Sequence, residues 1–232
     1  SSANFQTENG ILNIVSTDTR RLALSGTPVE DSTEGSSSLL PMKGVKEVQR
    51  ILGSLSPDAK IEILYDDAQF YFKAGSLEFT VRRVESRFPP YEQILPKGHS
   101  TCVALDRGSL ISALERVDVI VRDYNRMVVL DIAAGSSLMM RGKAPDFGQA
   151  MEEINAEITG NNLRIAVNSK FFMEALKVMR EPQVLLAFNG PSGHMAVRRI
   201  DSEGFLCLIA PINLSEQELK MDEIDSSGDN GL

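Results

Sequence analysis

The stretch that decides the fold reads PMKGVKEVQRIL over residues 41–52, and a related stretch, NSKFFMEALKVMR, follows over residues 168–180. Apolar residues recur every three or four positions in both stretches, which predicts two amphipathic helices. Each predicted helix carries three basic residues on one face, namely Lys43, Lys46 and Arg50 in the first and Lys170, Lys177 and Arg180 in the second. Three positions repeat at one constant offset, which pairs Lys43 with Lys170, Glu47 with Glu174 and Arg50 with Lys177. The sequence therefore predicts a duplicated unit built around a basic helix.

The composition is that of a soluble globular protein. The chain has 232 residues, 42% of them hydrophobic and 24% charged, and a net charge of −8. This length suits one large domain or two ordinary ones. The net negative charge argues against a protein that binds nucleic acid over its whole surface, but it is compatible with a local basic patch. Positive charge is scarce here, so its concentration on two helices calls for an explanation.

The sequence favours a cytoplasmic location. It opens with no charged-then-apolar signal segment and contains no apolar run long enough for a membrane span. Cys102 and Cys207 each lie among apolar residues, which favours two buried thiols in a reducing compartment over a disulfide. The first residue is not Met and a strand follows almost at once, so we expect a fragment of a longer chain.

Strand and turn signals dominate the rest of the chain. We expect strands over residues 11–16, 21–24, 61–65, 69–74, 77–84, 100–105, 127–133, 138–141, 152–158, 163–167, 183–188, 194–200 and 204–214, a loop at 34–38, and a third helix capped by Asp106 that runs to about residue 119. The proline-rich stretch at 87–91 and the turn at 96–98 mark a domain boundary. We predict one domain over 1–97 that lacks its opening helix, a second over 98–214, and an acidic, disordered tail over 215–232.

Motifs for catalysis, metal binding and nucleotide binding receive little support. No glycine-rich phosphate loop precedes a helix, and His99 and His194 have no metal ligand at the usual spacing. Asp66 and Asp67 read as a hairpin turn, with a catalytic or metal-binding pair as the alternative. A metal-dependent enzyme that uses loop carboxylates such as Asp66, Asp67 and Asp131 is one rival interpretation, and a β-rich protein-interaction module is another.

The basic stripes have two interpretations. A solvated helix face explains any single stripe, whereas repetition at one place in two units favours contact with phosphates. No aromatic side chains alternate with the basic ones, so we expect weak, nonspecific, salt-sensitive binding to a duplex backbone rather than stacking on bases.

An apolar segment, LCLIAPINL, spans residues 206–214. Its first part suits a buried strand. From Pro211 onward it cannot continue as a central strand, because proline lacks the N–H that the ladder needs. Ile212 and Leu214 then lie at an edge and line a groove, or the segment is a core strand with an irregular end.

Three short motifs carry a family resemblance. Thr17-Asp18 with Arg21-Leu22, the stretch RFPPY at 87–91 running to Leu95-Pro96, and the closing APINL at 210–214 occur in the order and spacing of one family. In these motifs the chain resembles the beta subunit of bacterial DNA polymerase III, the beta sliding clamp, over about residues 5–214. The resemblance implies an α+β DNA-clamp fold, with antiparallel sheets outside and helices on the inner, DNA-facing side. The chain is similar to the second and third of three clamp domains.

The resemblance also implies a function. Clamps of this family are non-catalytic processivity factors that close as homodimeric rings around duplex DNA. They tether the polymerase, the clamp loader and repair proteins, whose linear motifs dock in a hydrophobic groove. No cofactor, metal or membrane is expected, the location is cytoplasmic at the nucleoid, and this fragment is expected to be a monomer.

Site residues follow by position. The expected DNA-facing residues are Lys43, Lys46, Arg50, Arg116, Lys170, Lys177 and Arg180. The expected docking residues are Thr17, Arg21, Leu22, Pro89, Ile94, Asn168, Phe171, Ser192, His194, Leu208, Ile209, Pro211, Ile212 and Leu214. This chain departs from the family at Thr19 and Arg20, where Gly and His are frequent, and it continues past Leu214. The tail sequence QELKM at 217–221 loosely resembles a docking peptide, with a disordered acidic tail as the alternative.

Overall fold

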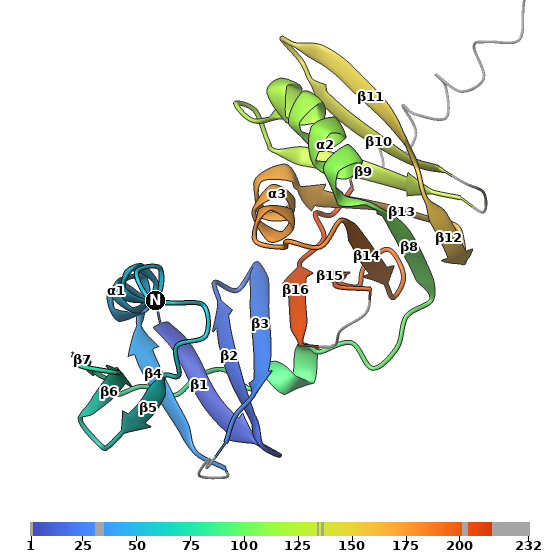
Figure 1. The fold of residues 1–232 in the computed structure, drawn as a ribbon. Helices are drawn as coiled ribbons and strands as arrows, with labels where there is room; N and C mark the ends of the chain where they lie inside the picture. The colour runs from blue at the N-terminus through green and yellow to red at the C-terminus, as the bar shows by residue number, and fades with distance from the viewer. Residues whose placement is uncertain (1, 31–34, 134, 136, 201–203, 215–232) are drawn as a thin grey trace, which may run out of the picture. The chain divides into compact units, whose positions relative to one another are not determined.

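The computed structural model describes residues 2–30, 35–133, 135, 137–200 and 204–214, so the proposed tail peptide lies outside it. The chain divides into two compact units, each an antiparallel α+β structure (Figure 1). Unit 1 comprises Ser1–Leu95 with Glu203–Leu206, and unit 2 comprises Pro96–Ser202 with Cys207–Leu232. Within the described ranges, no helix is long and apolar enough to cross a membrane.

The described residues of unit 1 form two antiparallel sheets and one α-helix. Its elements are β1 (Ser2–Glu8), β2 (Ile11–Thr17), β3 (Arg21–Pro28), β4 (Ser37–Pro41), α1 (Met42–Leu52), β5 (Glu62–Tyr65), β6 (Gln69–Ala74), β7 (Leu77–Arg82) and the short 3₁₀ helix η1 (Tyr91–Ile94). Four strands pair in the order β3-β2-β1-β4, and the other three form the meander β5-β6-β7. The sequence predicted this meander and its turns.

Aromatic side chains fill the core of unit 1. The rings of Phe5 on β1 and Phe70 on β6 meet edge to face with centroids 5.4 Å apart, and Phe72 stacks on Phe70 at 6.0 Å. Period-two alternation along both strands sends these rings to one face of each sheet. Ala3 and Leu40 complete this buried cluster.

The described residues of unit 2 also form two antiparallel sheets, and they include two α-helices. Its elements are β8 (Thr101–Asp106), α2 (Arg107–Val121), β9 (Met127–Ile132), β10 (Ser137–Ala144), β11 (Gly148–Asn155), β12 (Glu157–Gly160), β13 (Leu163–Asn168), α3 (Ser169–Lys177), β14 (Gln183–Phe188), β15 (Met195–Arg198) and, from Cys207 onward, β16 (Phe205–Ile209). The strands pair in the orders β11-β10-β9-β13 and β12-β8-β14-β15-β16.

The predicted cap opens α2. The Asp106 carboxylate accepts hydrogen bonds from the backbone N–H of Ser109 at 2.6 Å and from its hydroxyl at 2.7 Å. This satisfies one of the N–H groups that a helix start leaves free. Leu110, Leu114 and Val117 are then fully buried at helical spacing.

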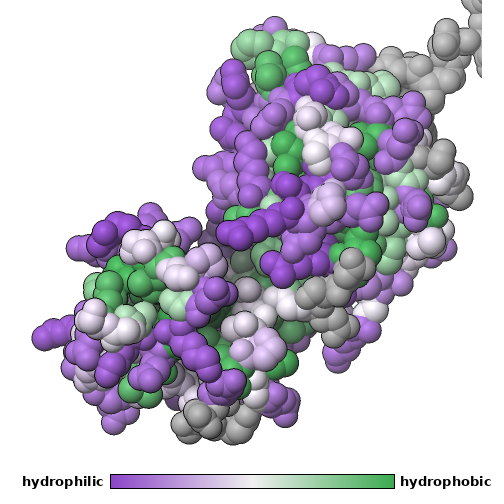
Figure 2. Space-filling view, viewed as in Figure 1, coloured by the Kyte–Doolittle hydropathy of each residue, from purple (hydrophilic) through white to green (hydrophobic). Residues whose placement is uncertain are grey.

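The two units share one topology. The sheet β3-β2-β1-β4 of unit 1 matches β11-β10-β9-β13 of unit 2, and β5-β6-β7 matches β14-β15-β16. The duplicated helix, α1 or α3, leaves the last strand of the first sheet in both units. Among the described residues, unit 1 has no counterpart of β8, α2 and β12. An apolar groove lies open beside α1, lined by residues such as Val48, Ile51 and Phe79, and hydrophobic surface is visible over this helix (Figure 2).

Three predicted strand and loop boundaries are wrong. The loop at 34–38 already contains the start of β4, because Ser37 and Ser38 pair with β1. The single strand at 152–158 is two strands, since β11 pairs with β10 whereas β12 pairs with β8. The last strand ends at Ile209 rather than at residue 214. Both cysteines are free thiols, as expected, but only Cys207 is buried, whereas Cys102 is partly exposed.

Candidate nucleic-acid interface and peptide-docking residues

The exposed face of α1 carries the first basic stripe. Lys43, Lys46 and Arg50 are exposed, whereas Gly44 is buried. A Cβ atom at Gly44 would lie 2.8 Å from Cγ1 of Val81 on β7, so this side of the helix packs closely on the meander. The three basic side chains therefore leave the helix on the side away from the core of unit 1.

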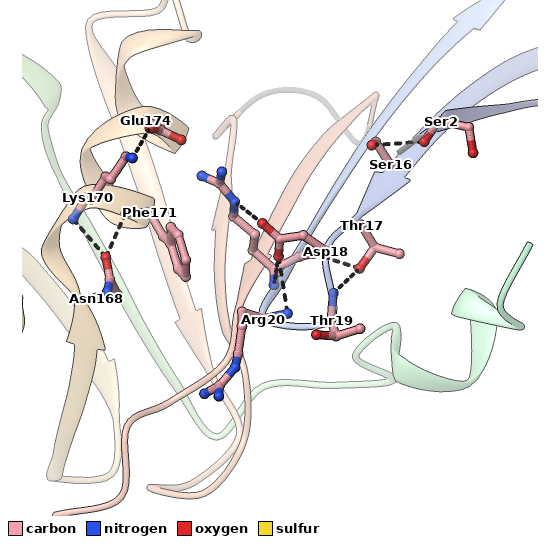
Figure 3. Close-up of polar contacts among 11 residues, drawn as sticks. Ser2, Ser16, Thr17, Asp18, Thr19, Arg20, Asn168, Lys170, Phe171 and Glu174 are labelled. Carbon is pink, nitrogen blue, oxygen red and sulfur yellow. Dashed lines mark hydrogen bonds and ion pairs between the residues drawn. The ribbon is translucent and has the colours of Figure 1, made fainter. Parts of the chain in front are cut away.

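The exposed face of α3 carries the second stripe. The side-chain oxygen of Asn168 caps the helix by accepting hydrogen bonds from the backbone N–H groups of Lys170 at 3.1 Å and Phe171 at 3.2 Å (Figure 3). Phe172 is fully buried, while Lys170 and Lys177 are exposed. Hydrophilic side chains gather over this helix (Figure 2).

Arg180 does not share the helical face with Lys170 and Lys177, and this part of the prediction is wrong. The helix ends at Lys177, and the backbone N–H of Arg180 donates to the Glu181 carboxylate at 3.0 Å. Pro182 follows directly, and helices usually end before the residue that precedes a proline. Arg180 is exposed, but it lies in the turn after α3.

Four predicted DNA-facing cations are held in ion pairs. These pairs join Arg50 to Glu47 at 3.0 Å, Lys170 to Glu174 at 4.0 Å, Lys177 to Glu115 at 3.0 Å and Arg116 to Glu152 at 2.6 Å. The Arg116 guanidinium binds Glu152 with two parallel hydrogen bonds, which raises the pKa of Arg116 and lowers the pKa of Glu152. These pairs offset part of the positive charge on both stripes.

Lys43, Lys46 and Arg180 carry the remaining positive charge. Their side chains have no ion pair among the residues that the structure describes. The sequence did not reveal this division. Two of the competing carboxylates, Glu115 and Glu152, lie 62 and 36 residues from their basic partners, and no local spacing rule connects them.

The predicted docking residues of unit 1 start at a tight hairpin. The Thr17 hydroxyl donates to the backbone carbonyl of Arg21 at 2.7 Å, and an Asp18 oxygen accepts from the backbone N–H groups of Arg20 and Arg21 at 3.2 and 3.1 Å (Figure 3). Thr19 takes a left-handed φ of 71°, where glycine is the usual residue. Partial burial tends to raise the pKa of Asp18, but hydrogen bonds and charge from Arg21 hold it below its usual value.

Three other residues of unit 1 were assigned to docking. Pro89 is exposed in the irregular stretch that was predicted there, and Ile94 is 43% exposed at the end of η1. Leu22 is only 1% exposed, so its side chain is not available on the surface. The sequence could not separate these cases, because all three residues follow turn-forming motifs.

The remaining docking residues belong to unit 2. Ser192 and His194 are exposed before β15, and Phe171 is half-buried in the first turn of α3. Leu208 and Ile209 are each 1% exposed within β16. They therefore behave as core residues in this structure.

The segment after β16 forms an edge, as one of the two sequence interpretations proposed. The backbone N–H of Ile212 donates to the carbonyl of Ala166 on β13 at 2.7 Å, and this bridge is isolated. Pro211, Ile212 and Leu214 are half-buried. Because proline cannot donate to a ladder, the chain leaves its strand and lies along β13.

The carboxylates of the rival enzyme interpretation have structural roles. Asp66 accepts from the backbone N–H groups of Ala68 at 2.7 Å and Gln69 at 2.8 Å, as the hairpin-turn interpretation predicted. Asp131 pairs with Arg141 and Arg164 on neighbouring strands. Within the described part of the chain, no cluster of three or more metal-ligating side chains is found.

Known proteins match nearly the whole described chain. Residues 2–90 match the family model of the DNA polymerase III beta subunit, central domain, and residues 92–213 match that of its C-terminal domain. The beta sliding clamp of Staphylococcus epidermidis is 27% identical over 211 residues, which cover 90% of this chain and 55% of that protein. The chain thus spans about half the length of the curated relatives it matches.

Solved structures agree in fold. The DNA polymerase III beta subunit of Thermotoga maritima superposes with a TM-score of 0.85 at 28% identity, over 92% of this chain and 57% of that one. A Pseudomonas aeruginosa sliding clamp bound to griselimycin gives a TM-score of 0.86 at 26% identity, over 92% and 57%. Since the C-terminal model alone covers more than half of these residues, the chain belongs to the DNA polymerase III beta subunit family.

Proposed function

We propose that this chain is the part of a sliding clamp that supplies two basic helices to the lining of a ring around duplex DNA. The observation that carries the proposal is the equal topological place of α1 and α3, each with exposed lysines, in a member of this family. In a chain of net charge −8, such a lining attracts the phosphate backbone while the rest of the surface repels it.

The mechanism is topological rather than catalytic. Contacts between lysine and phosphate are independent of base sequence and exchange readily with counterions, so a closed ring slides instead of stopping at one site. A polymerase tethered to such a ring gains effective concentration at the primer end without a new contact to DNA. The proposal includes no catalytic residue and no cofactor.

Partner docking is the second part of the proposal. Linear motifs of the polymerase, the clamp loader and repair proteins are proposed to dock on Phe171 and the Pro211–Leu214 edge of unit 2, and the Thr17 hairpin and Pro89 of unit 1 are proposed as further docking residues. Half-buried apolar side chains next to a strand edge favour such motifs, because a peptide can bury them.

The full-length protein is proposed to form a homodimeric ring in the cytoplasm, at the nucleoid. This chain alone is proposed to be a monomer. Light scattering tests this statement directly, and a mass of two chains or more contradicts it.

The DNA contact is tested by charge reversal on α1. Lys43→Glu with Lys46→Glu removes two cations that have no ion pair, and Lys73→Glu with Lys143→Glu is a control of equal net charge on strands β6 and β10. Binding to a fluorescent duplex is measured by anisotropy across low salt concentrations. Each phosphate contact contributes about 0.9 to the slope of log K against log salt, so the α1 variant should lose about two in slope. Equal losses in both variants would contradict a specific lining.

Docking is tested with a labelled Gln-x-x-Leu-Phe peptide in fluorescence polarisation. Pro211→Asp with Ile212→Asp should abolish binding, and Phe147→Asp, at a residue 62% exposed in the turn after β10, should not. Griselimycin, bound by the Pseudomonas aeruginosa clamp, should displace the peptide. Thermal melts of each variant separate lost docking from lost folding. Full binding by the double variant would refute docking at this edge.

A further inference from the structure

Unit 1 contains a polar pocket that shares Pro89 with the proposed docking residues and is otherwise not used by the proposed function. It has a volume of about 350 Å³ and lies between the strands β1 and β4 on one side and residues 83–92 on the other. All of its lining residues belong to unit 1. Its volume falls within the range of about 300–1,000 Å³ that is usual for small-molecule sites.

The strand alternation of β1 creates the floor of this pocket. Ala3 and Phe5 face the core, so Asn4 and Gln6 face the opposite side of the sheet. The chain after β7 crosses this side, fixed by a hydrogen bond from the backbone N–H of Val84 to a β4 carbonyl at 2.9 Å. Asn4 is therefore only 3% exposed, although its side chain is polar.

The side-chain oxygens of Asn4 and Gln6 on the floor already accept hydrogen bonds, whereas the buried hydroxyl of Ser38 on β4 has no partner. The side-chain oxygen of Gln6 accepts from the Tyr91 hydroxyl at 3.3 Å and from the Asn4 amide at 3.4 Å. The side-chain oxygen of Asn4 accepts from the Ser37 hydroxyl at 2.8 Å. The amide N–H₂ of Gln6 has no partner within the described residues, so the floor presents a donor.

The wall adds two guanidinium groups. Arg83 donates through Nη1 to the backbone carbonyl of Asp66 at 3.2 Å, which anchors it, but its buried Nε has no hydrogen-bond partner. Arg87 is exposed and has no ion pair among the described residues. The exposed carboxylate of Glu92 is the single acidic side chain among the lining residues. The pocket lining therefore presents mainly hydrogen-bond donors and positive charge, although the protein as a whole is acidic.

We propose that this pocket binds a small oxyanion, a carboxylate or phosphate group, through the guanidinium groups of Arg83 and Arg87 and the side-chain amide of Gln6. Guanidinium groups bind carboxylate and phosphate oxygens with paired hydrogen bonds. A buried donor without a partner is costly, and an oxyanion satisfies it. The volume accommodates a small organic acid or a phosphate ester.

The proposal is tested by NMR titration of the whole isotope-labelled chain. Inorganic phosphate and malonate are the two probes, and neutral malonamide is the control. We expect saturable shifts at the Gln6 side-chain amide and at Arg83 Nε with at least one of the two anions and none with malonamide. The stronger anion identifies the class of ligand. Chemical-shift changes that do not saturate, or that spread over the surface, would overturn the proposal. This result needs only the unmutated chain.

Variants separate the pocket from a general charge effect. Arg83→Gln should weaken binding at least about tenfold, because a hydrogen bond from a charged donor contributes that much. Arg82→Gln removes the same charge one residue away, outside the lining, and should change binding by less than about twofold. Arg87→Gln, at an exposed position, gives a second result if Arg83→Gln unfolds. Equal losses in the Arg82 variant and a pocket variant reject the site. Neither readout depends on DNA or peptide binding.

Discussion

Replacing Gly142 on β10 by alanine tests how closely helix α2 packs on its sheet. A Cβ atom at this position would lie 2.5 Å from Cγ1 of Val117 and 2.8 Å from Cγ1 of Val121, well inside ordinary contact distance. Both valines are fully buried on α2. Valine has one strongly preferred rotamer in a helix, so neither methyl group can turn away, and the helix must move from the sheet.

The magnitude follows from two opposing effects. Overpacking a well-packed core costs about 1–3 kcal/mol, whereas alanine gains about 0.5–1 kcal/mol over glycine inside a strand. We expect Gly142→Ala to lower the free energy of unfolding of unit 2 by about 1–2 kcal/mol, which lowers its Tm by roughly 3–8 °C. Scanning calorimetry measures both quantities.

Two further variants make this test specific. Gly108→Ala introduces the same methyl group in the first turn of α2, where the nearest atom is an Asp106 oxygen at 3.4 Å, and should be neutral or stabilising. Val117→Ala removes the closer of the two clashing methyl groups, so its combination with Gly142→Ala should destabilise less than the two single changes added together. A Gly142→Ala protein as stable as the parent, or strict additivity in the double variant, refutes the packing argument.

Three other outcomes are expected. Hydrogen bonds from Ser109 lower the pKa of Asp106, so its contribution to stability is present above the ordinary carboxylate pKa and is lost as pH falls through the folded value; Asp106→Ala should cost about 1 kcal/mol in urea unfolding at neutral pH and flatten this acid-side dependence. Burial and then the charge of Arg198 lower the pKa of His99, so stability should fall as pH drops below the ordinary histidine value, and His99→Gln should weaken this trend in melts at stepped pH. Gly160→Ala places a methyl group against the backbone carbonyl oxygen of Ser100 at a φ of +101°, and urea unfolding should show a loss above about 1 kcal/mol; an unchanged midpoint would contradict the geometry.

The ion pairs refine the role of the basic helices. Arg116 and Lys177 form ion pairs with carboxylates of their own unit, whereas Lys43 and Lys46 form none within the described residues. Surface ion pairs are weak and exchange with competing phosphates, so the paired cations remain able to turn toward DNA. DNA contact is still expected to depend most on the unpaired cations, because a paired cation must first exchange its carboxylate for a phosphate.

The sequence determined the elements whose signals are local. Helical spacing and the caps at Asp106 and Asn168 gave α2 and the start of α3, and turn residues gave the meander β5-β6-β7. It also determined the family, because the motifs near Thr17, Pro89 and Pro211 keep their order along the chain. Local hydrogen bonding and proline geometry act over a few residues, which is why they can be read without a fold.

Only the tertiary structure decided features that depend on distant partners. Ser38 lies in a strand because it pairs with β1. Residues 148–160 form two strands because β11 pairs with β10 in one sheet and β12 pairs with β8 in another. The burial of Leu22 and the ion pair between Arg116 and Glu152 likewise depend on contacts between segments that no spacing rule links. The physical reason is the same in each case, since strand pairing, burial and charge pairing are decided by neighbours in space. The sequence predicted the duplicated basic helix. The fold decided which of its basic side chains form ion pairs and which do not.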